Sequence, residues 1–394
     1  MRVLISGGGI AGPALAFWLQ RAGAEVTIVE RSRAPRPGGH AVDVRGVARD
    51  VIERMGLREA IRDSQVDERG WALVDARGRK RATMPADLFG GEGIVAEIEI
   101  ARGDLARILH DATAGAVDWR FGDRITALTP DGDATFASGG RERFDVVVGA
   151  DGVRSGVRAL AFGPHEEFVR PLGGRGAYFT VADPGDLDNW FEMFNAPGGL
   201  VAGIRPERGG TAKASLSFRT NEPWTRTDKA GQMRELRERF AGIGWRVPGF
   251  LASMPDAPDF YFDEITQVHV EKWRRGRVVL LGDAGYCGSP LAGLGTSMSL
   301  VGAYVLAGEL AAAASPEAAF AAYQEQMAAY VKDGTQLPPG GMKAFAPNSS
   351  LMIRMRAVSM RMMGVWPMKG MLEKQFTKAD AITLKNYAPA GLPS

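Results

Sequence analysis

The stretch RVLISGGGIAGPALAFWLQRAGAEVTIVE, residues 2–30, decides the fold. Its apolar start predicts a strand over residues 2–6, and the helical spacing that follows predicts a helix over 12–22 that stops at Gly23. EVTIV then predicts a second strand over 25–29. A strand, a helix and a strand within about thirty residues open a doubly wound sheet. We therefore expect an α/β protein that begins with a Rossmann-like unit.

Three glycines connect the first strand to this helix in a G-x-G-x-x-G pattern. Gly7 allows a tight turn, Gly9 lets a pyrophosphate approach the backbone, and Gly12 permits close packing of helix and strand. The helix N-terminus offers free N–H groups to phosphate. Glu30 ends the second strand, where a carboxylate accepts hydrogen bonds from ribose hydroxyls and repels a 2′-phosphate. The pattern predicts the adenosine of FAD or NAD rather than of NADP.

Composition narrows the class of protein. The 394 residues, 45% hydrophobic, predict a soluble globular protein of about two domains, and a formal net charge of +2 gives no reason to expect nucleic acid or a membrane. The single cysteine, Cys287, excludes an intramolecular disulfide. Together with a start that has no leader pattern, it favours the cytoplasm. The four histidines lack metal-ligand spacing, so no metal site is expected.

The pattern of apolar and polar residues changes at two places along the chain. Alternating segments between residues 168 and 266 predict an antiparallel sheet inserted into the first unit. Helices are expected near 44–55, 103–114, 229–241, 296–314 and 316–333, and strands near 123–129, 134–138, 144–148 and 277–281. We predict a discontinuous nucleotide-binding domain, an inserted substrate-binding domain and a C-terminal helical segment, over residues 1–69, 99–167 and 267–335; 70–98 and 168–266; and 336–394, respectively.

Two later motifs have the same pattern as the opening stretch, an apolar strand followed by a glycine turn. FDVVVGADGVRSGVR, residues 144–158, and VVLLGDAGYCGSPLAGLGTSMSL, residues 278–300, each run from an apolar strand into a glycine turn with an acid, Asp151 or Asp283. The three strand ends are expected at one crevice, where open α/β sheets bind ligands. One dinucleotide needs only one such turn for its pyrophosphate, so the further turns indicate a larger cofactor that stretches across the sheet.

In this order and spacing, the three motifs resemble the fingerprints of class A FAD-dependent monooxygenases, which have the para-hydroxybenzoate hydroxylase fold. The resemblance covers about residues 1–335. RPGGHAVDVRG (36–46), IARGDL (100–105) and KADAITLKNY (378–387) are most similar to the branch that contains the tetracycline-inactivating monooxygenases. The resemblance implies a Rossmann-like FAD-binding domain with an inserted antiparallel-sheet domain and a C-terminal helical segment.

The resemblance also implies site residues. Gly9 and Gly12 would hold the pyrophosphate, Glu30 the adenosine ribose, and Ile125 the adenine through its backbone. The other positions implied to contact FAD are Arg31, Asp43, Arg102, Asp151, Asp283, Pro290, Gly293, Leu294 and Gly295. Arg36 and Arg154 would meet NADPH or NADH, and substrate contacts are expected from Tyr178, Met193, Phe218, Pro290 and Leu291.

The implied reaction is the hydroxylation of an aromatic or polyketide-like small molecule. NADH or NADPH would reduce the flavin, and O₂ would then be captured as a flavin C4a-hydroperoxide that delivers one oxygen atom. No catalytic side chain is expected, because the cofactor performs the chemistry. Two alternatives stay open: a flavoprotein reductase or saturase without oxygen insertion, and a non-catalytic FAD-binding protein. The chain has no W-x-W-x-I-P stretch, which disfavours a flavin halogenase.

Several of these residues also have plain structural explanations. Arg102 stands where a helix is expected to start, Asp43 fits a local turn, and Cys287 fits a small buried apolar side chain. The aromatic residues of the inserted sheet, with Arg205 among them, fit a core as well as a substrate wall. Residues 342–371 hold eight of the 16 methionines; we expect a helix packed across the inserted sheet, with a basic membrane-surface helix as the alternative. A monomer or dimer is expected.

Overall fold

A computed structural model describes residues 1–35, 38–66, 68–89, 98–225, 227–362 and 377–388. Its first layer is a six-stranded sheet of order β17-β18-β11-β1-β2-β7, parallel except for the edge strand β17. The strands are β1 (Arg2–Ser6), β2 (Glu25–Glu30), β7 (Asp118–Phe121), β11 (Val146–Gly149), β17 (Arg274–Arg275) and β18 (Val278–Leu280). This is the doubly wound sheet that the opening stretch predicts.

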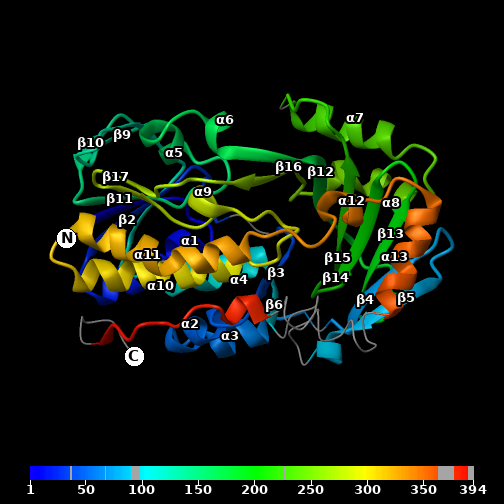
Figure 1. The fold of residues 1–394 in the computed structure, drawn as a ribbon. Helices are drawn as coiled ribbons and strands as arrows, with labels where there is room; N and C mark the ends of the chain where they lie inside the picture. The colour runs from blue at the N-terminus through cyan, green and yellow to red at the C-terminus, as the bar shows by residue number, and fades with distance from the viewer. Residues whose placement is uncertain (36–37, 67, 90–97, 226, 363–376, 389–394) are drawn as a thin grey trace.

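Three helices pack side by side next to this sheet. Helix α1 (Ala11–Arg21) packs against α10 (Gly295–Ala312), and α10 packs against α11 (Pro316–Gly334), as Figure 1 shows. Val3, Leu4 and Ile5 of β1 have no exposed surface, so the strand is buried on both faces, as a parallel strand between helices must be. The Ser315 side chain accepts a hydrogen bond from Ala318 N–H and caps α11.

Shorter elements surround this sheet. Strand β3 (Ala41–Val44) pairs antiparallel with β6 (Ile98–Ala101). Among the described residues, a three-stranded sheet and further helices also belong to this unit: β8 (Ile125–Leu128), β9 (Asp133–Phe136), β10 (Arg141–Arg143), α2 (Ala48–Arg54), α3 (Arg58–Asp63), α4 (Arg102–Asp111), α5 (Gly156–Ala161), α6 (His165–Phe168), α9 (Asp283–Tyr286) and the short helix η3 (Thr377–Asp380).

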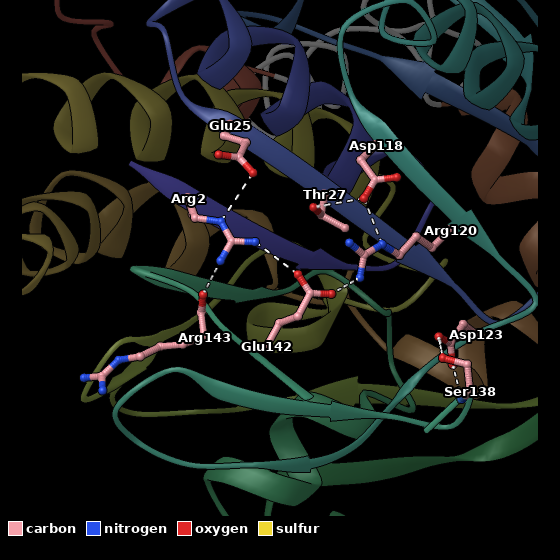
Figure 2. Close-up of polar contacts among 9 residues, drawn as sticks. All are labelled: Arg2, Glu25, Thr27, Asp118, Arg120, Asp123, Ser138, Glu142 and Arg143. Carbon is pink, nitrogen blue, oxygen red and sulfur yellow. Dashed lines mark hydrogen bonds and ion pairs between the residues drawn. The ribbon is translucent and has the colours of Figure 1, made fainter. Parts of the chain in front are cut away.

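The N-terminal edge of the parallel strands carries a network of ion pairs. Arg2, at the start of β1, binds Glu25 at 3.3 Å and Glu142 at 3.0 Å, and Arg120 binds both Glu142 and Asp118 (Figure 2). These pairs are partly exposed, and such pairs contribute little stability individually. The charged edge contrasts with the opposite, C-terminal edge, where the glycine turns lie.

The second layer is a seven-stranded sheet of order β16-β12-β15-β14-β13-β4-β5, antiparallel except between β4 and β13. Residues 70–85 add two strands at one end of this sheet, although they are distant in sequence from the rest. The strands are β4 (Gly70–Val74), β5 (Lys80–Pro85), β12 (Val169–Ala182), β13 (Trp190–Ala196), β14 (Leu200–Pro206), β15 (Thr211–Arg219) and β16 (Tyr261–Val268). In Figure 1, β12 and β16 lead from the first unit into this sheet.

The two faces of the second sheet have different partners. Alternate residues such as Phe179, Phe194 and Phe218 form a core on the face covered by α7 (Lys229–Arg239) and α8 (Val247–Ser253). The other face carries Trp71 and Met193, which pack with α12 (Gly341–Phe345) and α13 (Ser350–Met362).

Some element boundaries differ from the predictions. The helix expected near 44–55 is shorter, because β3 runs to Val44 and a turn at Gly46, with φ of 53°, precedes α2. The helix expected within 342–371 is divided into α12 and α13. Residues 90–97 of the predicted substrate-binding segment and residues 363–371 lie outside the described residues. None of the helices described is both long and apolar enough to span a bilayer.

Candidate active site

The three glycine turns meet at the C-terminal edge of the parallel sheet. Because β1 lies beside β11, a methyl group at Gly7 would stand 2.4 Å from the Ala150 carbonyl oxygen. A methyl group at Gly12 would stand 2.0 Å from the Gly7 carbonyl oxygen, and one at Gly282 would stand 3.1 Å from Ala11 Cβ. Distances below 3 Å are too short for a real side chain, so close backbone approach requires glycine at Gly7 and Gly12.

Glu30 lies beside the first glycine turn. Its carboxylate accepts hydrogen bonds from the backbone N–H of Gly8 at 2.8 Å and of Ser32 at 2.9 Å. The side chain is buried, and its carboxylate oxygens are hydrogen-bond acceptors that lie beside the first glycine turn. Asp123 N–H donates to the Glu30 carbonyl at 3.2 Å, which brings the segment leading to Ile125 to the same place. Arg31 follows Glu30 and is exposed.

Trp119 borders the same turn, and sequence analysis missed it. A methyl group at Gly8 would stand 2.9 Å from Trp119 Cζ3 and 3.2 Å from Glu30 Cβ. The indole stacks on Phe121, with ring centroids 5.2 Å apart and planes at 10°. Trp119 reaches this position because β7 pairs with β2, which places it opposite Ile28. That pairing is a long-range event, so no local pattern around Trp119 could have identified it.

Arg102 lies over the first glycine turn. It is the first residue of α4, and its Nη2 would stand 3.1 Å from a methyl group at Gly9. Its side chain also passes Gly39, where a methyl group would stand 3.1 Å from Arg102 Cβ. A guanidinium beside open backbone N–H groups fits the pyrophosphate of a dinucleotide, and a side chain at Gly9 would fill that space.

Asp283 occupies the third strand end. It begins α9, and its Oδ1 would stand 3.6 Å from a methyl group at Gly295, where α10 starts. Burial raises the pKa of Asp283, while a hydrogen bond from the Cys287 thiol and the charge of Arg102 oppose that rise. Burial also raises the pKa of Cys287 well above its ordinary value, which fits the interpretation of Cys287 as a packed thiol.

The carboxylate of Asp151, at the second strand end, accepts hydrogen bonds from groups of the protein itself. The donors are the Ser155 hydroxyl, Gly156 N–H at 2.8 Å and Val157 N–H at 3.2 Å. Asp151 therefore caps the start of α5. Its predicted contact with FAD stays a prediction.

Two arginines of the second motif differ in role. Arg158 is fully buried and donates to the Ala284 carbonyl at 2.8 Å, which ties the second motif to the third; sequence analysis did not single it out. Arg154 binds Asp263 of the second sheet at 2.7 Å and lies 4.4 Å from the Trp224 ring centroid. Arg36, the other residue predicted to meet the nicotinamide cofactor, lies outside the described residues.

Strand β3 approaches the start of α10. Asp43 Oδ2 binds Arg45 Nε at 3.0 Å and Nη2 at 2.7 Å, so its carboxylate is paired locally. Arg45 N–H donates to the Ser297 hydroxyl at 2.9 Å. This bond fixes the Asp43–Arg45 pair beside the first turn of α10.

The loop over residues 289–295 leads into α10. Ser289 has a φ of 73°, a strained backbone conformation for a residue other than glycine, and Gly293 has the same value without that cost. Pro290 is exposed, whereas Leu294 is buried. Leu291 packs with the cluster of the second sheet that contains Met193, so the loop connects the two sheets.

Of the predicted substrate residues, Tyr178, Met193 and Leu291 belong to the side of the second sheet that meets this loop. The Tyr178 ring lies 5.1 Å from the His40 ring, which belongs to the first unit. Phe218 is different: it has no exposed surface and packs in the helix-covered core on the opposite face. Phe218 and Tyr178 therefore lie on opposite faces, because successive residues of a strand point to opposite faces, and the substrate contact expected of Phe218 stays a prediction.

A buried charge cluster lies at the junction of the two sheets. Arg205 Nε is 3.1 Å from Glu68 Oε2, and Arg205 Nη1 also pairs with Glu99. The two carboxylate side chains are 0% and 2% exposed, and burial raises the pKa of both, that of Glu99 well above its ordinary value. One guanidinium shared by two buried carboxylates leaves an excess negative charge, and repulsion from Glu68 adds to burial in raising the pKa of Glu99.

Within the described part of the chain, no three His, Cys, Asp or Glu side chains gather as metal ligands would. The polar groups around the three strand ends are instead hydrogen-bond donors, namely backbone N–H groups and Arg102, and carboxylate acceptors. This set fits FAD: N–H groups and a guanidinium for phosphates, and carboxylates for hydroxyl groups.

Comparisons with known proteins agree with this fit. A family model described as FAD binding domain matches residues 1–337. An uncharacterized protein of Mycobacterium tuberculosis is 43% identical over 355 residues, which are 88% of this chain and 94% of that protein. A flavin-dependent monooxygenase of an unknown prokaryotic organism is 38% identical over 343 residues, covering 84% of this chain and 86% of its own length.

A solved structure extends the likeness to the whole fold. The tetracycline destructase Tet(51) is 32% identical, with a TM-score of 0.82 and 98% of each chain covered. These findings confirm the family, the fold class and the FAD cofactor that the three sequence motifs predict. The chain therefore belongs to the FAD-binding domain family and is a flavin-dependent monooxygenase.

Proposed function

We propose that this enzyme uses NADH or NADPH and O₂ to hydroxylate an electron-rich aromatic or polyketide-like small molecule. One oxygen atom becomes the new hydroxyl group, and the other leaves as water with the hydride and a proton. The observation that carries the proposal is the convergence of three strand ends, with Arg102 over Gly9 and with Asp283, the first residue of α9, beside the start of α10. We assign FAD to residues 1–69, 99–167 and 267–335, and substrate to 70–98 and 168–266.

Bound FAD supplies the redox chemistry and the activation of O₂. In this assignment, the backbone at Gly9 and Gly12 holds the pyrophosphate and Arg102 balances its charge. Glu30 accepts the adenosine ribose hydroxyls, and Asp283 accepts hydroxyls farther along the cofactor. The remaining proposed contacts are Arg31, Asp43, Ile125, Asp151, Pro290, Gly293, Leu294 and Gly295.

The start of α10 has an electrostatic role in this proposal. Its first residue, Gly295, follows a loop that we place along the edge of the isoalloxazine ring. The positive end of a helix favours nearby negative charge, and a reduced flavin is anionic. The start of α10 would thereby stabilise negative charge on the bound cofactor, without any proton transfer from a side chain.

The second sheet supports a substrate with little charge. Met193 and Leu291 belong to an apolar cluster next to the loop, which excludes water from the reacting atoms. Arg205 is already paired with Glu68 and Glu99, so it offers no spare charge to a substrate carboxylate. This favours a neutral polyphenol or polyketide over an aromatic acid, and the likeness to a tetracycline destructase adds tetracyclines to that class.

The nicotinamide cofactor is proposed to dock only transiently. Arg154 already pairs with Asp263, so a dinucleotide would have to compete for it. NADH and NADPH are distinguished by comparing the rates at which each bleaches the flavin absorbance anaerobically. A cytoplasmic monomer or dimer completes the proposal.

The proposal is tested with a panel of polyphenols, polyketides, tetracyclines and aromatic acids. A substrate should stimulate NAD(P)H oxidation and oxygen uptake, and its product should carry one oxygen atom from ¹⁸O₂. A product without label would favour the reductase or saturase alternative. If every compound left NAD(P)H oxidation at its basal rate while FAD stayed bound, the non-catalytic alternative would gain support.

A further inference from the structure

Helix α13 exposes an unusual amount of apolar surface. Leu351, Met355, Val358 and Met362 are 67%, 61%, 52% and 52% exposed, and Met352 is 40% exposed. Met360 of the same helix is 3% exposed and packs on the second sheet. The expected packing across the inserted sheet is present, but most methionines of α13 face outward rather than into a core.

The exposed residues form one continuous stripe. Residues advance by about 100° in a helix, so positions 351, 355, 358 and 362 stack along one side. Met360 lies on the opposite side and anchors the helix, which runs along the outer edge of the second sheet beside β5 (Figure 1). A stripe of this kind is costly in water and marks an interaction surface.

Basic side chains surround the stripe. The helix sequence SLMIRMRAVSMRM contains Arg354 and Arg361 beside the exposed residues and has no Asp or Glu. Arg361 Nε donates to the Arg81 carbonyl at 2.6 Å, which fastens the helix to β5. Lys80 and Arg81 of β5 are exposed as well, and Asp75 pairs with Arg81 at 2.7 Å.

The apolar stripe and the arginines beside it favour one of two possible partners, a second copy of the chain or a lipid bilayer. A second copy of the chain, docked stripe to stripe about a twofold axis, would bring Arg354 and Arg361 toward their own copies with no carboxylate on the helix to balance them. An anionic bilayer offers hydrocarbon for the stripe and negative headgroups for the arginines at the same depth. Charge complementarity therefore favours lipid.

We propose that α13 is a membrane-surface docking helix, which lays Leu351, Met355, Val358 and Met362 into the headgroup region of an anionic bilayer. Arg354 and Arg361 bind the lipid phosphates. The chain lies on the membrane and does not cross it. This inference is independent of the substrate, because the stripe lies on the outer side of α13.

The test uses the full-length FAD-loaded protein and sedimentation with vesicles. We expect binding to vesicles of phosphatidylcholine with phosphatidylglycerol, weak binding to phosphatidylcholine alone, and a loss of binding at high salt. The double variant Leu351→Ser/Met355→Ser should bind anionic vesicles at least about tenfold more weakly. The matched control is Leu160→Ser on α5, which removes a side chain 41% exposed elsewhere and should bind as the parent does.

Two results would overturn the proposal. The first is equal sedimentation of the parent and the double variant with anionic vesicles, or no sedimentation of either. The second is a parent protein that is dimeric and does not bind vesicles, together with a double variant that is monomeric. That result would identify a second copy of the chain as the partner. The flavin spectrum and melting temperature of each variant show that it is folded, so a loss of binding reports on the surface.

Discussion

The two sheets of this enzyme carry their functional residues in opposite ways. In the parallel sheet, the residues at the crevice stand directly after buried strands, in short motifs around Gly12, Asp151 and Asp283. In the antiparallel sheet, the residues that face the crevice alternate with core residues, and partners such as Glu68 and Arg205 come from distant segments. The first arrangement is local and visible in sequence, while the second depends on register and packing.

The largest effect is expected at the first turn. Gly12→Ala puts a methyl group 2.0 Å from the Gly7 carbonyl oxygen, which the backbone cannot accommodate without moving. We expect protein that purifies without FAD or fails to fold. Gly115→Ala is the control, since its added methyl group meets nothing within 4 Å. Flavin content per polypeptide and melting temperature measure both, and a yellow, stable Gly12→Ala would show that the turn is not tightly packed.

The second largest effect is expected on the free energy of unfolding, when the buried cluster of Arg205, Glu68 and Glu99 loses its arginine. Arg205→Met removes the only charge partner that the ion pairs give Glu68 and Glu99 among the described residues. Breaking a buried pair typically costs about 3–5 kcal/mol. Arg58→Met removes an exposed pair with Glu53 and should change the free energy of unfolding very little. Urea unfolding measures both, and similar values for the two variants would contradict the role of burial.

Asp283 tests the third strand end. Asp283→Ala should weaken FAD binding by about tenfold to a hundredfold, since hydrogen bonds to charged groups contribute about 1.5–3 kcal/mol. Asp283→Asn keeps an acceptor and should lose less. Asp104→Ala, on the exposed side of α4, is the control. FAD titration of the apoprotein measures the dissociation constants, and an unchanged value for Asp283→Ala would remove this residue from the cofactor site.

The smallest effect concerns pH. Burial raises the pKa of Glu99 well above its ordinary value of 4.5. A raised pKa in the folded state means that the stabilising contribution is complete below the unfolded pKa and is lost as the pH rises through the folded pKa. Glu99→Gln, neutral at every pH, should therefore lose less stability than the parent from mildly acidic to alkaline pH. Melting temperatures across that series measure the slope, with Glu53→Gln as an exposed control. Parallel slopes would mean that Glu99 is ionised throughout.

The difference between the two sheets also explains which features could be predicted from the sequence. The strand and helix order of the parallel sheet, the glycine turns and the acids after them follow from local patterns, and the structure brings them together at one edge. Trp119, Arg158 and the Glu68–Glu99 pair were missed, because each acquires its role through contact with a segment far away in sequence. Phe218 and Tyr178 look alike in sequence, and only the register of β12 and β15 separates them.

The sequence by itself determined the family, the FAD cofactor and the α/β architecture. These depend on glycine at close backbone approaches and on apolar strands, which are short-range requirements. The tertiary structure decided which face each residue of the second sheet occupies, how Arg205 is neutralised, and that the methionines of α13 lie outside. Those outcomes depend on long-range packing, because a helix or strand has two sides and only its neighbours decide which one is buried.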